Sequence, residues 1–182
     1  LKDQERNDYF SGGIYGNGQV PKLLNIGSML GIAIRGAAQG AGVNNDGQIS
    51  SIINIGSITG TSTGSGGGYG IHNEGYIIDI RNIGVIYGKT NAVKNKAGKT
   101  IVSLDNYGIL ATEGNSIIDN TGTITNTPTN YGLYIAEADG KVSFDDTKQS
   151  NSPVEIIVGH DDGGNEIKRN MTIKNADLEG AS

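Results

Sequence analysis

The 182-residue chain contains no cysteine and no tryptophan, and it has only three prolines and two phenylalanines. The absence of cysteine excludes a disulfide framework. No apolar run approaches the ~20 residues that a membrane-spanning helix needs. No segment keeps the i, i+3, i+4, i+7 apolar spacing of an amphipathic helix. Helices and membrane insertion are therefore not expected.

Positive charge is also scarce, since 14 Lys and Arg stand against 19 Asp and Glu, for a net charge of −5. This balance argues against nucleic acid as a partner, because phosphate recognition needs a basic surface. The acidic excess lies in residues 137–182. The only basic group comprises Lys89, Lys94, Lys96 and Lys99. Two interpretations stay open for it: solvated loop lysines, or a patch for a sulfated or sialylated glycan.

Glycine, by contrast, is abundant at 30 residues, and much of it lies in a repeated unit of the form aliphatic-x-Asn-x-Gly-x-aliphatic. The clearest copies are Val43–Ile49, Ile52–Ile58, Ile71–Ile77 and Ile80–Ile86, with further copies at Leu23–Met29, Leu104–Leu110 and Ile118–Ile124. A fixed repeat of this kind favours an ordered repeat architecture over a low-complexity chain.

The units come in pairs, with asparagines at positions 17 and 25, 45 and 54, 73 and 82, 95 and 106, and 120 and 130. Gly and Asn tolerate tight turns and positive φ, whereas Ile, Val and Leu favour strands. Each unit therefore predicts two short strands that meet at a corner. A pair of units gives two corners, and the variable stretch between pairs gives a third, so each coil of ~22–28 residues predicts one turn of a three-sided parallel β-helix. About six or seven coils would stack at ~4.8 Å, with ladders of Ile inside and hydrogen-bonded ladders of Asn.

The chain divides into three segments. Residues 1–12 lead into the repeats, which occupy residues 13–136. In residues 137–182 the unit disappears, and two expected strands at 154–158 and 166–175 flank the turn-rich stretch 159–165, which predicts a hairpin or a protruding loop. The segment is either a set of diverged coils or a cap that shields the open end of the stack.

These units resemble those of secreted bacterial adhesins, namely autotransporter passengers and filamentous-haemagglutinin-like proteins. The stretches at 54–60 (NIGSITG) and 82–88 (NIGVIYG) are similar to the large fusobacterial autotransporter adhesins. The resemblance implies an all-β, right-handed β-helix at the bacterial surface, secreted or anchored in the outer membrane through a C-terminal translocator. It also implies attachment to a host glycan, a host protein receptor or another bacterium. The sequence shows neither export signal nor translocator, which predicts a monomeric fragment of a longer passenger.

Contact residues are expected in the variable loops, because tyrosine supplies binding area at low entropic cost. The candidates are Thr61–Gly70 with Tyr69 and Tyr76, Tyr87 with Lys89, and the 159–165 loop. An inert spacer of the same adhesin remains the alternative, in which none of these residues binds anything.

An enzyme, a cofactor and a metal site are not expected. Gly60–Gly64 matches the G-x-S-x-G pattern, but the following Ser65–Gly68 cannot begin the helix which that motif needs. His72 is expected as a surface or corner residue. The loop residues His160, Asp161, Asp162, Asn165 and Glu166 form either a solvated acidic hairpin or a weak cation site. A polysaccharide-active enzyme is the least favoured class, because the carboxylates of the repeats lie at variable positions and do not form the pair that a glycosidase needs. These carboxylates are Asp46, Glu74, Asp79, Asp105, Glu113 and Asp119.

Overall fold

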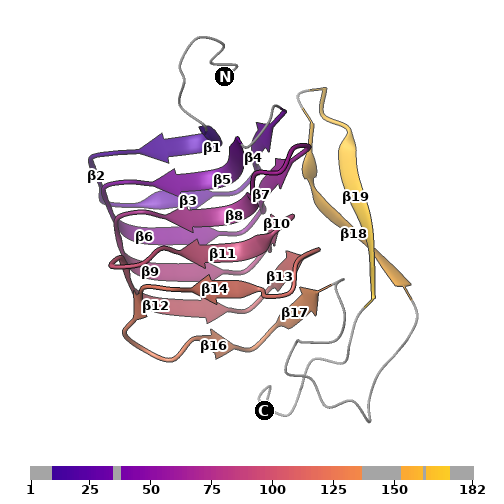
Figure 1. The fold of residues 1–182 in the computed structure, drawn as a ribbon. Coiled ribbons are helices and arrows are strands. Elements are labelled where there is room, and N and C mark those ends of the chain that lie inside the picture. The colour runs from indigo at the N-terminus through magenta and orange to yellow at the C-terminus, as the bar shows by residue number, and fades with distance from the viewer. Residues whose placement is uncertain (1–9, 35–37, 137–152, 162, 173–182) are drawn as a thin grey trace.

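A computed structural model describes residues 10–34, 38–136, 153–161 and 163–172. Over these residues the chain is all-β without a helix, and its parallel sheets stack as a β-solenoid of about four turns (Figure 1). No helix in this part of the chain is long and apolar enough to cross a bilayer. The expectation of an all-β solenoid is confirmed.

Each turn of the chain visits three parallel sheets in the same order. Sheet A contains β1 (Phe10–Gly16), β5 (Gln39–Asn45), β8 (Gly68–Asn73), β11 (Asn91–Asn95) and β14 (Ile118–Asn120). Sheet B contains β6 (Gln48–Asn54), β9 (Tyr76–Asn82) and β12 (Thr100–Asn106), with the short strands β2 (Gln19–Val20), β3 (Leu23–Asn25), β15 (Thr123–Ile124) and β16 (Thr129–Asn130) at its two ends. Sheet C contains β4 (Ser28–Ala33), β7 (Ser57–Ser62), β10 (Val85–Gly88), β13 (Ile109–Thr112) and β17 (Leu133–Ala136). The described strands do not confirm the expected six or seven coils.

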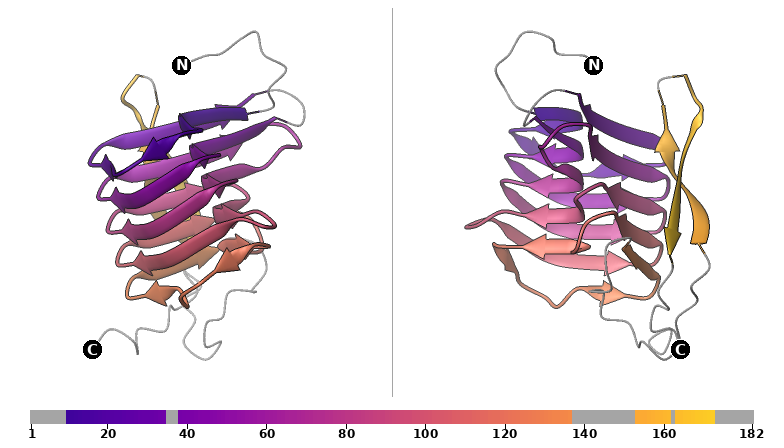
Figure 2. Two further views of the ribbon diagram at one scale, coloured as in Figure 1. Left: turned by 90° about the vertical axis from the view of Figure 1, so that its left-hand side faces the viewer. Right: turned by 45° about the vertical axis from the view of Figure 1, so that its right-hand side comes forward.

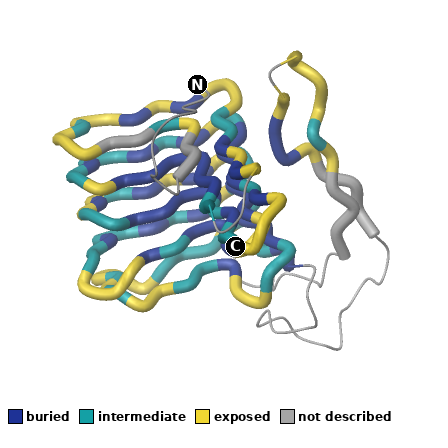
Figure 3. Tube along the Cα trace, turned by 45° about the horizontal axis from the view of Figure 1, so that its top comes forward, coloured by how far each residue is buried: buried dark blue, intermediate teal, exposed yellow. Residues whose placement is uncertain are grey.

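The interior is built from ladders of apolar side chains, one from each turn. Figure 3 shows that buried residues recur in successive turns of the chain. The register of neighbouring strands places equivalent repeat positions directly above one another. The ladders are Ile14, Val43, Ile71, Val93 and Ile118 in sheet A; Val20, Ile49, Ile77, Ile101 and Ile124, and Leu23, Ile52, Ile80 and Leu104, in sheet B; and Met29, Ile58, Ile86, Leu110 and Tyr134 in sheet C. The predicted Ile ladders are confirmed.

Asparagines of the repeat form two further ladders along the stack, as the sequence predicts. In one, the amide Nδ2 of Asn54 donates to Asn82 Oδ1 at 2.7 Å, and Asn82 Nδ2 donates to Asn106 Oδ1 at 2.7 Å. In the other, Asn45 donates to Asn73 at 2.8 Å, and Asn73 donates to the Oδ1 of the next asparagine, Asn95, also at 2.8 Å. Because the amides are buried, these bonds satisfy groups that would otherwise be costly to desolvate. Asn17 does not join the second ladder, since Gly16 is the residue paired with Asn45.

Most glycines of the repeat are required for a reason other than the predicted one. In the described residues only Gly98, in the turn between β11 and β12, and Gly164, in the turn of the hairpin, have positive φ. A Cβ on Gly84 would lie 2.0 Å from the carbonyl oxygen of Gly56 in the turn before it, and a Cβ on Gly75 would lie 2.0 Å from the carbonyl oxygen of Gly47. The corners therefore need glycine because successive turns approach too closely for any side chain.

The C-terminal segment forms an antiparallel hairpin of β18 (Pro153–His160) and β19 (Glu166–Thr172), which confirms the two predicted strands and the turn between them. The hairpin stands alongside sheet C and runs along the stack, contacting β4, β7, β10 and β17 (Figure 2). Val158 packs with Tyr87, Ala111 and Ile135 in a second small core outside the solenoid. The described part of this segment thus covers a side of the solenoid; residues 137–152 and 173–182 lie outside the described residues, as do 1–9 of the lead-in.

Candidate interaction surfaces

The same repeat unit forms two corners in every turn, and they differ in one exposed position. We call the turn from sheet A into sheet B corner AB, and the turn from sheet B into sheet C corner BC. The residue that follows the repeat Asn is exposed or half-exposed at both corners. At corner AB these residues are polar, namely Asp46, Glu74, Lys96 and Thr121, whereas at corner BC they are Ile26, Ile55, Ile83, Tyr107 and Tyr131.

Corner BC therefore carries a continuous stripe of large apolar side chains in contact with solvent. Ile26 is 70% exposed and the other four members are 48–49% exposed. The rings of Tyr107 and Tyr131 stack with centroids 5.0 Å apart and an interplanar angle of 16°. Single exposed apolar residues are ordinary on protein surfaces, but a contiguous row is typical of an interaction site. The sequence carries this signal in the residue that follows the second Asn of each pair, a position outside the core and corner positions that define the repeat.

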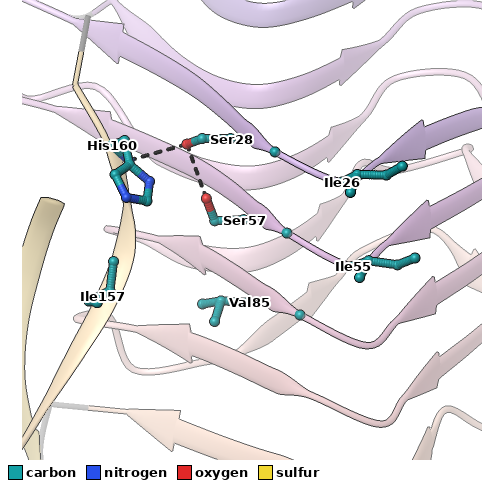
Figure 4. A pocket seen from close by; sticks show the side chains of 10 residues that line it. Ile26, Ser28, Ile55, Ser57, Val85, Ile157 and His160 are labelled. Atoms are coloured by element: carbon teal, nitrogen blue, oxygen red, sulfur yellow. Dashed lines mark hydrogen bonds between the residues drawn. The ribbon is translucent and has the colours of Figure 1, made fainter. Parts of the chain in front are cut away.

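A groove lies between this stripe and the hairpin (Figure 4). Its volume is about 360 Å³, and it is lined by Ile26, Ile55 and Val85 of the solenoid and by Ile157 and His160 of the hairpin. The polar lining is already engaged, because Ser57 Oγ donates to Ser28 Oγ at 3.0 Å, and Ser28 Oγ accepts the backbone N–H of His160 at 3.2 Å. The groove is suited to an apolar side chain rather than to a charged group.

Corner AB presents a network of paired polar groups. Lys96 Nζ donates to Glu74 Oε2 at 2.9 Å, and the other carboxylate oxygen of Glu74 lies 3.4 Å from His72 Nδ1. His72 also contacts Asn44 Oδ1 at 3.0 Å, and its ring stacks against Tyr69. Burial lowers the pKa of His72 to about 4, against the opposing effect of Glu74, so the imidazole is neutral at pH 7.

No protein-family model, no curated protein and no solved structure matches this chain. The functional argument therefore depends on the geometry of these surfaces.

The expectation that Tyr87 is a surface contact residue is wrong, and of the two alternatives for His72, surface or corner, the surface one is wrong. Tyr87 is completely buried beneath the hairpin, where its hydroxyl donates to the Glu113 carboxylate, so it is not a surface contact residue. His72 is only 2% exposed, because the Tyr69 ring stacks on it. In both cases a strand residue that points out of the solenoid is covered by another part of the chain, the hairpin over Tyr87 and the Tyr69 ring over His72.

The remaining contact candidates are exposed or partly exposed. Residues 63–67 connect β7 to β8, and Tyr76 is 40% exposed. Lys89 is exposed, although its Nζ donates to the backbone oxygen of Ser62 at 2.8 Å. Lys94 and Asp119 form an ion pair. Three of the four lysines in the basic group thus have partners within the solenoid, which is the arrangement expected of solvated structural lysines rather than of a free anion patch.

The enzyme-like and metal-like motifs have structural roles. Ser62 Oγ donates to the backbone oxygen of Ala38 at 3.2 Å, and β7 continues into a turn and then β8, not into a helix. The Asp161 carboxylate accepts the backbone N–H groups of Gly163 and Asn165, both at 2.8 Å, and the side-chain and backbone hydrogen bonds from Asn165 lower its pKa. Asp162 lies outside the described residues. Within the described ranges no three His, Asp or Glu side chains gather as metal ligands would.

Proposed function

We propose that this chain is a section of a bacterial cell-surface adhesin passenger, which displays recognition surfaces on a stiff β-solenoid. One observation carries the proposal: the repeat fixes the interior Ile and Asn ladders in every turn, while the exposed position of corner AB and the connections between sheets C and A differ from turn to turn. A scaffold of this kind separates stability from recognition, because each turn contacts only its neighbours. The autotransporter-like repeats support the same function.

The finer architecture belongs to this proposal. The three parallel sheets support a three-sided, right-handed β-helix, and the full passenger section would contain about six or seven coils. It would be secreted or held at the outer membrane, and its partner would be a host glycan, a host protein receptor or the surface of another bacterium.

The test is binding of the labelled protein to a glycan array and to intact host and bacterial cells, with a matched loop variant. The connection from β10 to β11 is only Lys89–Thr90, so the residues 63–67 between β7 and β8 are replaced by Lys-Thr to copy it. We expect saturable binding that this graft weakens at least ~10-fold, a loss of roughly 1.4 kcal/mol. A second variant shortens the 163–165 turn of the hairpin.

The alternatives have distinct outcomes in the same experiment. A folded protein that binds no glycan and no cell would be a spacer of the adhesin. Cleavage of any polysaccharide on the array would contradict the proposal and indicate an enzyme.

A further inference from the structure

We infer that corner BC is a self-association surface. A second copy of this chain packs against it side by side, and the stacks of turns in the two copies run in opposite directions. The surface comprises the stripe Ile26, Ile55, Ile83, Tyr107 and Tyr131, together with the neighbouring outward positions of sheet B. This pairing goes beyond the proposed function, since it does not depend on the identity of a receptor.

The spacing of the stripe selects the partner. One apolar side chain projects from each turn, at the ~4.8 Å separation of neighbouring strands. An extended peptide repeats on one face every ~6.6–6.8 Å and an α-helix turns every ~5.4 Å, so neither stays in step with all the members of the stripe. A second solenoid has the same pitch and stays in step along its whole length. A two-fold axis across the stripe then makes the same patch contact itself, as in most protein dimers.

Charge at the edge of the stripe selects the orientation and the register. Arg81 and Asp105 are outward positions of sheet B that lie side by side on β9 and β12, each just before a repeat Asn. In the described part of the chain neither residue takes part in an ion pair. An antiparallel pair places the sheet B edges of the two copies against each other. With the two-fold axis between the turns of Ile83 and Tyr107, Arg81 of each copy faces Asp105 of the other.

The same register matches the apolar groups. Ile83 of one copy meets Tyr107 of the other, and Ile55 meets Tyr131. Large side chains of this size class that are about half exposed offer on the order of 500 Å² per copy for the whole stripe. This is below the ~800 Å² per partner of a typical stable interface, so the pair should be reversible and weak, with a Kd in the range of tens to hundreds of micromolar.

Sedimentation velocity over a range of protein concentrations tests the surface. We expect the wild-type protein to show a reversible monomer–dimer equilibrium, and Ile83→Asp to weaken it at least ~10-fold, because the change places a carboxylate in the apolar contact. Thr121→Asp is the matched control, since it introduces the same carboxylate at the equivalent position of corner AB and should leave the equilibrium unchanged. Both sites are exposed, so circular dichroism and thermal unfolding should show that both variants remain folded.

A charge exchange tests the register. Arg81→Asp and Asp105→Arg should each weaken self-association, because each homodimer then opposes like charges. An equimolar mixture of the two variants should pair again, since both contacts between the two copies become attractive. A wild-type protein that stays monomeric, or an Ile83→Asp variant that pairs as the wild type does, would overturn the inference. A mixture that does not pair would overturn the antiparallel register. None of these outcomes affects the array and cell binding that tests the proposed function.

Discussion

The two corners of the solenoid have the same backbone and opposite surfaces. Both have a buried asparagine ladder and a glycine whose Cβ would strike the turn before it. Yet corner AB exposes Asp46, Glu74 and Lys96, whereas corner BC exposes isoleucine and tyrosine. The stack thus fixes the Asn and Gly and leaves the residue between them free. An apolar row maintained at such a free position has no explanation in folding, which is why we assign it to recognition.

The largest effect is expected from the glycines, and it should be equal at the two corners. Gly84→Ala and Gly75→Ala each place a methyl group 2.0 Å from a carbonyl oxygen of the preceding turn, so the backbone must shift. Overpacking against backbone should cost at least ~3 kcal/mol of unfolding free energy. Gly27→Ala is the control, because Gly27 has the same repeat position and a Cβ added there would have no atom within 4 Å. The free energy of unfolding of the three variants should be measured with a denaturant. If Gly27→Ala were as destabilising as the other two changes, close stacking of the turns would not be the reason for glycine.

The asparagine ladders should come next. Asn82→Ala at corner BC and Asn73→Ala at corner AB each remove the side chain that connects two neighbouring asparagines of a ladder. The lost hydrogen bonds to the next asparagine are 2.7 Å long for Asn82 and 2.8 Å long for Asn73. Leaving a buried amide partner unsatisfied should cost about 2 kcal/mol in each case. Asn130→Ala, at the last described turn of the BC ladder, should cost less because its side chain is only half-buried. A large difference between Asn82→Ala and Asn73→Ala in chemical denaturation would show that the two corners are not equivalent inside.

Lowering the pH should reduce the free energy of unfolding through His72, which lies next to corner AB. Its folded-state pKa of about 4 lies below the value of ~6.5 of an unfolded chain, so the unfolded state takes up a proton first as the pH falls. Stability should therefore decrease between pH ~6.5 and ~4, by on the order of 2 kcal/mol for this group. His72→Asn is the control, since the equivalent residue in the preceding turn is Asn44. Unfolding free energies at several pH values should show a shallower acid slope in this variant; an unchanged slope would exclude His72 as the cause.

The smallest effect is expected at the exposed position itself. Tyr131→Thr, which copies Thr121 of corner AB, removes the ring stacked 5.0 Å from that of Tyr107. An exposed aromatic pair of this kind should contribute only about 0.5 kcal/mol. Thermal unfolding should shift by a few degrees at most. A loss as large as that of the asparagine variants would mean that the apolar corner is part of the folding core.

The sequence predicted the interior well and the exterior poorly, for one physical reason. A strict repeat determines which residues stack, so the Ile and Asn ladders follow directly from the positions of Ile52, Ile80, Asn54 and Asn82. The packing of the hairpin against sheet C depends on contacts between segments far apart in the chain, such as Val158 with Tyr87. No local pattern reports such contacts.

The glycines show a subtler limit. The repeat reveals that the position of Gly84 excludes a side chain, but not whether φ or a close carbonyl is responsible. The stripe at corner BC, in contrast, is readable from the sequence once the two units of each pair are compared separately.

The most direct test of the difference between the corners is to convert one corner into the other. A variant with Ile55→Asp, Ile83→Glu, Tyr107→Lys and Tyr131→Thr gives corner BC the residues of corner AB, turn by turn. Its sedimentation should be measured against concentration, alongside thermal unfolding. We expect a folded protein with nearly unchanged thermal stability that remains monomeric where the wild type pairs. A variant that unfolds, or one that still pairs, would contradict the assignment of the apolar corner to recognition.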